Sequence, residues 1–401
     1  MTAILTLNAG SSSVKFSVYL SDNDLTRLAH GQVESVGDAA RLSLEHGETR
    51  IQQEVRADNQ AVALSVILEA LQPVLKGRRV AGIGHRIVHG GKRFDGPALL
   101  TSDVVKQLEA LAPLAPLHQP ANLSGVVSAR EAFPGAIQVG CFDTAFHRNH
   151  PWVNDTFALP RKLYAEGVRR YGFHGLSYQY VTEALRRDAP DIAKGRVVIA
   201  HLGNGASMCA LRDCVSIGST MGFSALDGLP MGTRCGQLDP GVILYLLDQG
   251  WSVEAISDLL YKESGLKGLS GISHDMRTLL DSDAAEAREA INYFTFRLRR
   301  EIGAMAAVLG GIDALVFCGG IGEHAASIRS EAVRGLDYLG LRMDEPANQC
   351  SEPKISSGDV AILVVPTDEE RVIARATQHL LQSESGHWPS TPLPVGVRAA
   401  S

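Results

Sequence analysis

Residues 4–20, ILTLNAGSSSVKFSVYL, predict two strands joined by a short polar turn. The apolar residues before the turn favour a strand, and Val14, Phe16 and Val18 alternate with other residues as in a second strand. The turn offers backbone N–H groups and hydroxyls that suit an anion such as a phosphoryl group. Lys15 adds a positive charge, and Asn8 adds a side-chain oxygen able to face a metal ion. An ordinary hairpin turn is the alternative, because Gly and Ser occur in most turns.

A second segment of the same form lies about half the chain away. Residues 196–211, RVVIAHLGNGASMCAL, again predict an apolar strand, a turn of small and polar residues, and another apolar strand. The repetition is one of form rather than of close sequence identity. It suggests two related halves that face one another and hold a nucleotide between two phosphate-binding turns.

Length and composition predict a globular protein with two domains. The chain has 401 residues, of which 45% are hydrophobic and 20% charged. A net charge of −6 without a long basic run makes nucleic acid an unexpected partner. We expect no secretory signal and no transmembrane helix, since no apolar run approaches ~18–20 residues. Six cysteines without a Cys-x-x-Cys pair favour reduced thiols in a cytoplasmic protein.

Periodicity and capping signals place the remaining elements. Apolar spacing predicts helices over 61–75, 240–247, 252–260 and 284–309, and a further helix over 325–335. A strand at 360–365 precedes Thr367 and Glu370, which fit a capping box and leave Glu369 available at the strand–helix junction. We expect the domain boundary near His150.

Residues 80–91 contain the first candidate for substrate binding. On a strand, Arg86 and Val88 share one face, and a guanidinium beside an aliphatic side chain suits a small carboxylate. An Arg in a structural ion pair is the alternative. His85 and His89 would suit a metal on a helix, but their Gly and β-branched neighbours favour a strand.

Other candidates stand in loops or at strand ends. Asp143 ends a predicted strand, a usual place for site chemistry in α/β folds. His174 lies in a short loop rich in Arg, Gly and aromatic residues, and Arg234 is the strong cation of the long irregular loop 218–241. Asp275 and Arg277 end a Gly/Ser loop, where they suit a ribose and a ring or phosphate.

Taken together, these segments resemble the acetokinase family of the actin-like ATPase superfamily. The resemblance covers residues 4 to about 380, and its motifs stand in family order. They are NAGSSSVK (8–15), GHRIVHGG (84–91), FDTAFH (142–147), YGFHG (171–175), HLGNG (201–205), MGTR (231–234), GGIGE (319–323) and TDEE (367–370).

The resemblance implies an α/β fold of two ribonuclease H-like domains with the active site in the cleft between them. The domains are expected at 1–150 and 151–368, with a helix at 369–382 packing back on the first and a disordered tail at 383–401. The implied reaction is reversible, Mg²⁺-dependent, direct in-line transfer of the γ-phosphoryl group of ATP to acetate, giving acetyl phosphate and ADP. Mn²⁺ is expected to substitute for Mg²⁺, and the implied assembly is a cytoplasmic homodimer formed through the second domain.

The resemblance also assigns roles by position. Asn8 and Glu369 match the magnesium positions, and Asp143 matches the catalytic aspartate, for which we prefer orientation of metal-bound water to proton abstraction. Arg86 and Arg234 match the two substrate arginines.

The remaining positions concern the transferring group, the methyl pocket and the nucleotide. His174 matches the histidine that steadies the transferring group, so the expected catalytic set is Asp143, Arg86, His174, Arg234 and Glu369. The methyl pocket is expected from Val88, Leu117, Phe173 and Ala225. The nucleotide segments are expected from Lys15, His201, Leu202, Gly203, Asn204, Gly205, Asp275, Met276, Arg277, Gly320, Ile321, Gly322, Glu323 and His324.

Four positions depart from the family pattern: Ala225 stands where Pro is usual, Gln237 where Asp is usual, and His324 and Asp368 where Asn is usual. Ala225 would loosen the acyl pocket, so a propionate or short-chain fatty acid kinase is the first alternative. A sugar-type kinase is a second, although two arginines beside apolar residues favour a carboxylate. An ATP-binding chaperone module is a third, but about 20 residues of tail cannot supply a peptide-binding domain.

Overall fold

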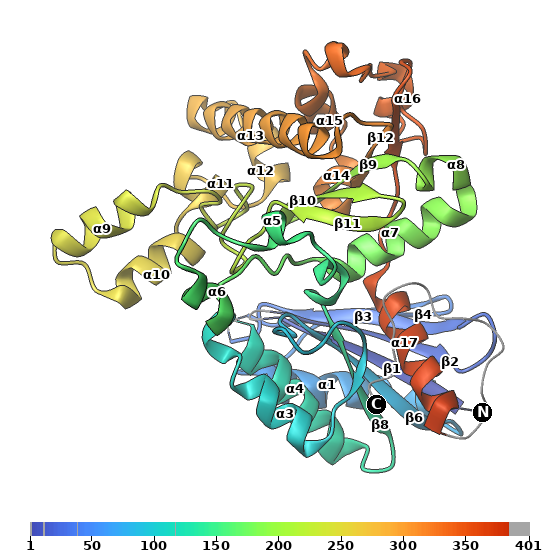
Figure 1. The fold of residues 1–401 in the computed structure, drawn as a ribbon. Helices are drawn as coiled ribbons and strands as arrows, with labels where there is room; N and C mark the ends of the chain where they lie inside the picture. The colour runs from blue at the N-terminus through green and yellow to red at the C-terminus, as the bar shows by residue number, and fades with distance from the viewer. Residues whose placement is uncertain (1, 11–12, 38, 117, 385–401) are drawn as a thin grey trace. The chain divides into compact units, whose positions relative to one another are not determined.

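The chain forms two compact units, each built on one mixed sheet (Figure 1). The computed structural model describes residues 2–10, 13–37, 39–116 and 118–384. Unit 1 combines the chain up to Arg148 with the chain from Asp368 onward, and unit 2 spans Asn149–Thr367. Whether each unit is a domain that folds alone stays a prediction, as do the domain limits drawn from the sequence.

Unit 1 contains an eight-stranded sheet in the order β5-β4-β3-β2-β1-β6-β8-β7. The hairpin expected at residues 4–20 is its β1–β2 pair, in which Asn8 lies opposite Lys15. β1, β6 and β8 run parallel, so their carboxyl ends meet at one edge of the sheet. The strands are β1 (Thr2–Ala9), β2 (Ser13–Leu20), β3 (Arg27–Glu34), β4 (Arg41–His46), β5 (Thr49–Glu54), β6 (Arg79–Ile87), β7 (Ala98–Leu99) and β8 (Ile137–Phe142).

Helices cover both faces of this sheet because β1 is apolar on both sides. Leu5 and Leu7 pack in a core with α1 and α4, whereas Ile4 points the other way and packs with Ala374 of α17. α17, drawn in red, therefore lies on the N-terminal strands although it ends the described chain (Figure 1). The helices of unit 1 are α1 (Gln60–Ala70), α2 (Gln72–Leu75), α3 (Ser102–Glu109), α4 (Gln119–Ala132) and α17 (Glu369–Glu384), with short 3₁₀ turns at Ala112–Leu114 and Ala145–His147.

Unit 2 contains a five-stranded sheet in the order β11-β10-β9-β12-β13. Its central β9 pairs antiparallel with β10 and parallel with β12, as β1 pairs with β2 and β6 in unit 1. Five strands in each unit thus share one order and orientation, which is the repetition suggested by the two hairpin sequences. The strands are β9 (Arg196–Leu202), β10 (Ala206–Arg212), β11 (Val215–Ser219), β12 (Ala314–Cys318) and β13 (Ala361–Val364).

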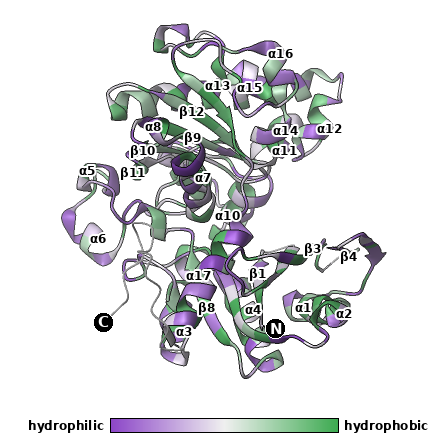
Figure 2. Ribbon diagram, turned by 90° about the vertical axis from the view of Figure 1, so that its right-hand side faces the viewer, coloured by the Kyte–Doolittle hydropathy of each residue, from purple (hydrophilic) through white to green (hydrophobic). Residues whose placement is uncertain are grey.

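The longest helix of unit 2 forms where the sequence predicts it. α13 spans Ala285–Leu309, buries Phe294, Leu298 and Ile302 on one face, and ends at Gly310 in a left-handed conformation with φ 71°. Figure 2 shows hydrophobic residues along the sheet strands and hydrophilic residues on α7. The other helices are α5 (Trp152–Asp155), α6 (Arg161–Glu166), α7 (Gly175–Asp188), α8 (Pro190–Ala193), α9 (Pro240–Asp248), α10 (Val253–Lys262), α11 (Gly265–Ser270), α12 (Met276–Leu280), α14 (Gly319–His324), α15 (Ala326–Val333) and α16 (Glu345–Gln349), with a 3₁₀ turn at Asp337–Leu339.

Three local predictions are wrong. The helix expected at 61–75 divides into α1 and α2, because Pro73 supplies no N–H and suits the first turn of a new helix. The Gly-rich turn at 319–324 is itself helical, so α14 precedes α15. Thr367 is not the cap of the last helix: Asp368 accepts the Arg371 N–H at 3.0 Å, because it directly precedes Glu369, the first residue of α17.

In the part of the chain that the structure describes, none of the helices is long and apolar enough to cross a membrane.

Candidate active site

Unit 1 brings four of the predicted residues to the carboxyl edge of its sheet. Asn8 lies near the end of β1, Arg86 near the end of β6, and Asp143 directly after β8. Glu369 joins them from the first turn of α17. Residues 57 to 361 positions apart in sequence thus meet, three of them because the parallel strands β1, β6 and β8 end together.

Arg86 and Asp143 form a buried ion pair with two parallel hydrogen bonds. Nε of Arg86 donates to Oδ1 of Asp143 at 2.9 Å, and Nη2 donates to Oδ2 at 2.6 Å. The Asp143 side chain is 1% exposed. Burial alone would lower the pKa of Arg86, but the negative charges of Asp143 and Glu369 outweigh it and raise that pKa. The ion pair that the sequence left open as an alternative role for Arg86 is therefore present. The remaining guanidinium nitrogen, Nη1, donates to Asn8 Oδ1 at 3.3 Å.

The two residues expected to bind magnesium supply oxygen atoms close to this pair. Oε2 of Glu369 lies 3.9 Å from Nε of Arg86. Burial, and then the charge of Glu369, raises the pKa of the neighbouring Glu370, while Lys15 lowers it. The described residues contain no group of three His, Cys, Asp or Glu side chains able to hold a metal ion. An amide oxygen and a carboxylate nevertheless fit Mg²⁺, which commonly keeps several waters and shares substrate phosphates.

Two buried amides that the sequence did not single out brace this edge. Asn122 of α4 accepts the Val88 N–H at 2.9 Å and donates to the Ala9 carbonyl at 2.5 Å, so one side chain links the segments that follow Arg86 and Asn8. Gln119, one turn earlier, exchanges hydrogen bonds with the backbone of His89. Buried polar groups need such partners, but no sequence signal marks them in advance.

Two residues of the expected methyl pocket, Val88 and Leu117, belong to unit 1. Val88 is 4% exposed. Leu117 lies outside the described residues. His85 ends up on β6 paired with Gln138 rather than on a helix with His89, which agrees with the strand interpretation of this segment.

Unit 2 brings His174 and His201 together. Their rings stack with centroids 4.3 Å apart. Nδ1 of His174 pairs with Ser207 Oγ at 2.8 Å, and Nδ1 of His201 pairs with Ser177 Oγ, also at 2.8 Å. His174 has φ 57°, a left-handed conformation that is costly for a residue with a Cβ and is found mostly where function requires it.

The glycine turn after β9 lies against these histidines and Arg234. A Cβ on Gly205 would stand 3.1 Å from His174 Nε2 and 3.9 Å from Arg234 Nη1, so a side chain at this position would crowd the imidazole. Arg234 donates from Nη1 to the Ala225 carbonyl at 3.2 Å. Four predicted residues, His201 at the end of β9 and His174, Gly205 and Arg234 from three loops, thus converge. Phe173 beside His174 is buried at 2% exposure.

The predicted nucleotide turn is α14, which follows β12. Gly319 has φ 75°, and a Cβ there would approach the Leu202 carbonyl oxygen to 2.7 Å, so only glycine fits. Oε1 of Glu323 accepts the N–H groups of Gly319 at 2.9 Å and Thr367 at 3.2 Å. Arg329, fully buried, donates to the carbonyls of Gly322 and Glu323 and fixes the end of this helix. Gly320 and His324 are exposed, as a binding turn requires.

Asp275 and Arg277, which were expected to bind the nucleotide, bond to each other at the start of α12. Asp275 caps α12 by accepting the Arg277 N–H at 2.9 Å, and the Arg277 side chain donates to the same carboxylate. Hydrogen bonds from Arg277 lower the pKa of Asp275. The Arg277 side chain is 88% exposed, so it can still reach a ligand.

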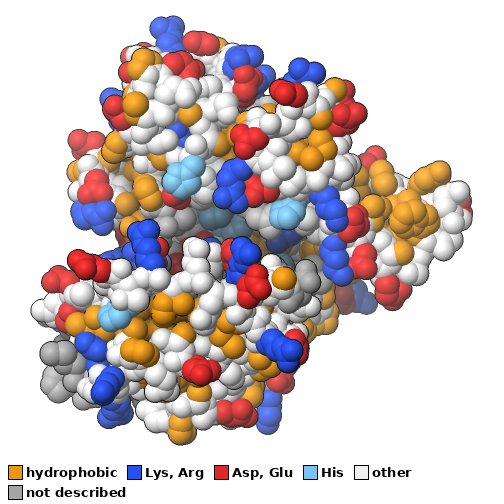
Figure 3. All heavy atoms as spheres, turned by 180° about the vertical axis from the view of Figure 1, so that it is seen from behind, with side chains coloured by type: hydrophobic (Ala, Val, Ile, Leu, Met, Phe, Trp, Pro, Cys, Tyr) orange, Lys and Arg blue, Asp and Glu red, His pale blue; other side chains and the backbone are white. Residues whose placement is uncertain are grey.

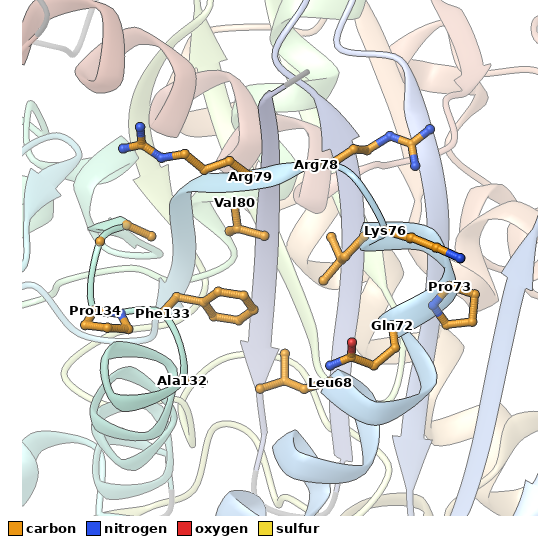
Figure 4. Close-up of a pocket in the computed structure, with 13 residues that line it drawn as sticks. Leu68, Gln72, Pro73, Lys76, Arg78, Arg79, Val80, Ala132, Phe133 and Pro134 are labelled. Carbon is orange, nitrogen blue, oxygen red and sulfur yellow. The ribbon is translucent and has the colours of Figure 1, made fainter.

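A separate groove of unit 1, with a volume of about 1060 Å³, contains none of the predicted site residues. Figure 4 shows Leu68, Val80 and Phe133 toward its interior and Lys76, Arg78 and Arg79 around it. It lies at the amino end of β6, away from the carboxyl edge where Arg86 stands.

The paired β-β-β-α-β-type sheets, with polar turns at their carboxyl edges, define the actin-like ATPase fold. The model of the acetokinase family matches residues 3–375, and the chain belongs to that family. A similar relative is the acetate kinase of Methylocella silvestris, 54% identical over 94% of this chain and 98% of that protein.

Two solved structures are also similar. The propionate kinase of Francisella tularensis has a TM-score of 0.88 at 37% identity, covering 94% of this chain and 99% of that one. The acetate kinase of Porphyromonas gingivalis has a TM-score of 0.84 at 36% identity, covering 95% of this chain and 100% of that one.

Proposed function

We propose that the protein is an acetate kinase that transfers the γ-phosphoryl group of ATP reversibly to acetate, giving acetyl phosphate and ADP. Family membership over residues 3–375 supports the reaction class. The observation that carries the proposal is the carboxyl edge of unit 1, where Asn8, Arg86, Asp143 and Glu369 come together. A partly buried arginine between oxygen ligands suits an anionic substrate beside a metal-bound phosphate.

The chemistry demands positioning more than proton transfer. Acetate is already a nucleophile, so its carboxylate oxygen can attack the γ-phosphorus in line while ADP leaves. Arg234 and His174 are the groups of unit 2 that would stabilise charge on the transferring phosphoryl group, since polar nitrogens of both lie beside Gly205. The bidentate bond to Arg86 supports a role for Asp143 in fixing that guanidinium, alongside its expected role toward metal-bound water.

Asn8 and Glu369 would hold Mg²⁺, and Mn²⁺ is proposed to substitute. When bound, the ion would neutralise charge on the phosphate oxygens. Lys15, opposite Asn8 on the neighbouring strand, would add a further positive charge for the phosphates. Residues 201–205, 275–277 and 320–324 are the segments proposed for the nucleotide.

Propionate is the second candidate substrate. Ala225, whose carbonyl holds Arg234, has only a methyl side chain where the family commonly has a Pro ring. The similarity to a propionate kinase structure supports this alternative as well. One methylene changes binding by only ~1–3 kcal/mol, so we expect an acetate-to-propionate ratio of kcat/KM below about 100.

We propose a homodimer formed through unit 2. Its α9 and α10 expose Leu244 (67%), Tyr245 (62%) and Val253 (69%), and α13 exposes Phe296 (57%). Figure 3 shows hydrophobic side chains gathered on the projecting α9–α10 segment, on the right of that view. Exposed apolar side chains in such number favour a protein interface. A cytoplasmic location is proposed because the six cysteines, all among the described residues, form no disulfide.

A single assay tests the reaction and its acceptor. The purified protein is incubated with ATP and Mg²⁺ and with acetate, propionate, butyrate or glycerol in turn, and acyl phosphate is trapped with hydroxylamine. We expect acyl hydroxamate from acetate and propionate. ADP formation with glycerol, without hydroxamate from any acid, would indicate a sugar-type kinase and contradict the substrate roles of Arg86 and Arg234.

A further inference from the structure

His174 is held by a short chain of buried hydroxyls that the reaction scheme above does not use. Ser207 of β10 is fully buried, and its Oγ lies 2.8 Å from His174 Nδ1 and 2.5 Å from the hydroxyl of Tyr178. Tyr178 is also fully buried, one helical turn after His174 on α7. Serine is therefore the link between a phenol and an imidazole.

The chemistry of the three groups determines which of them donates in each of these hydrogen bonds. A phenol is a stronger hydrogen-bond donor than an aliphatic hydroxyl, and an unprotonated imidazole nitrogen is a stronger acceptor than a phenol oxygen. Burial raises the pKa of Tyr178 well above its usual value, so its O–H stays a donor at every working pH. Tyr178 then donates to Ser207, and Ser207 donates to His174 Nδ1.

The opposite side of the ring faces the proposed phosphoryl site. Because Nδ1 accepts from Ser207, the proton of the neutral ring is on Nε2. Nε2 is the atom that a Cβ on Gly205 would approach to 3.1 Å, beside Nη1 of Arg234. Stacking on His201, whose own Nδ1 is held by Ser177, fixes the plane of the His174 ring.

We propose that Ser207 and Tyr178 are positioning residues that fix the tautomer of His174, so that its Nε2–H is the donor offered to the transferring phosphoryl group. The proposal rests on the function proposed above. It also accounts for the left-handed backbone at His174, which sets the imidazole between Ser207 on one side and the glycine turn on the other.

Kinetic measurements on matched variants test the proposed role of Ser207 and Tyr178. Ser207→Ala should lower kcat roughly 10–100-fold, because a preorganised donor loses its fixed tautomer. Tyr178→Phe should cost less, since Ser207 still reaches Nδ1. The double variant should match Ser207→Ala, because Tyr178 acts only through Ser207. KM for acetate and ATP should change less than about threefold in all of them.

Ser216→Ala is the control. Ser216 is a buried serine of the neighbouring strand β11, and its Oγ pairs with another histidine, His150, at 2.7 Å. Its replacement should destabilise the protein comparably and leave kcat unchanged. Equal loss of kcat in the Ser216 and Ser207 variants would overturn the proposal, as would a double variant clearly slower than Ser207→Ala.

A spectrum of the protein without substrate provides a readout independent of turnover. With ¹⁵N-labelled histidine, and His174→Gln to assign the signal, His174 should show a protonated Nε2 and an unprotonated Nδ1, and Ser207→Ala should show both tautomers. A protonated Nδ1 in the neutral wild-type ring would overturn the proposal even if Ser207→Ala failed to fold. Absence of acyl phosphate from every acid would instead overturn the proposed function. The spectrum would then still test whether Ser207 and Tyr178 fix the tautomer of His174.

Discussion

Arg234 is the cation whose loss should matter most to turnover. It lies with His174 beside Gly205, and its Nη1 donates to the Ala225 carbonyl. Arg234→Ala should lower kcat roughly 10³-fold or more, the usual effect of removing an arginine that stabilises phosphoryl transfer. The melting temperature should change little. Hydroxamate formation measures the rate, with Arg334→Ala, an exposed arginine of unit 2, as control; a rate within tenfold of wild type would contradict the assigned role.

Asp143 should matter to stability as well as to rate. Asp143→Asn removes the charge that compensates Arg86, whose side chain is only 21% exposed. Glu369 would then be the remaining counter-charge, 3.9 Å from Nε, and the loss of the bidentate partner should lower the free energy of unfolding by about 3 kcal/mol. Urea denaturation measures this, with Asp188→Asn as control because the Arg187–Asp188 pair is exposed and should contribute little. Equal midpoints for the two variants would argue against a stabilising pair.

At the scale of elements, β6 and the loop after it should make stability depend on pH. Burial lowers the pKa of His85 and of His89 to about 4, against an ordinary 6.5. The folded state therefore disfavours protonation, so stability is complete above pH 6.5 and falls as the pH drops toward 4. Each histidine should account for up to roughly 3 kcal/mol of this loss.

Urea denaturation at several pH values measures that dependence. In His85→Gln, which keeps an amide group near Gln138, stability should fall less steeply between pH 6.5 and 4 than in wild type. The difference between the two proteins above pH 7 isolates the packing effect of the substitution. Parallel profiles over the whole range would exclude His85 as a source of the pH dependence.

The side-chain amide of Gln237, in the loop before α9, accepts hydrogen bonds from α13. Gln237 Oε1 accepts from Nη2 of Arg297 at 2.9 Å and also from Arg300. Arg297 is 9% exposed, so a carboxylate at position 237 would compensate a largely buried charge. Gln237→Glu should therefore raise the free energy of unfolding by about 1–2 kcal/mol, measured by urea denaturation. The gain should shrink in high salt, and a loss of stability at low salt would contradict this account.

The sequence predicts elements better than contacts. The period of α13 predicts its buried face and its end at Gly310, because the local pattern and the tertiary packing agree there. Asn8, Arg86, Asp143 and Glu369 could be selected from motifs, and the parallel strands explain why they meet. Asn122, Ser207 and Tyr178 could not be selected, because a buried polar side chain is recognised only once its partners are known. The cap at Asp368 shows that a capping-box pattern alone does not fix a helix start.

At the scale of the whole molecule, the exposed apolar residues of α9 and α10 predict the state of assembly. Leu244→Asp combined with Val253→Asp should convert a dimer into monomers, because each places a charge in a desolvated contact. Sedimentation velocity measures the change. Tyr338→Asp, at an equally exposed aromatic residue of unit 2, should leave the dimer intact. A wild-type protein that sediments as a monomer would contradict the proposed interface.

The placement of α17 has a consequence for the order in which the protein is made. Gly82 and Gly84 of β6 have no side chains, and Thr377 and Ile373 of α17 fill that space. Strands β1 and β6 are synthesised early, yet α17, the helix that covers them, is synthesised only after the whole of unit 2. Unit 2, which is one continuous segment, is complete before unit 1. The apolar sheet face that α17 covers therefore lacks its native partner while more than two hundred residues are added, and unit 1 can be completed only after unit 2 has been synthesised.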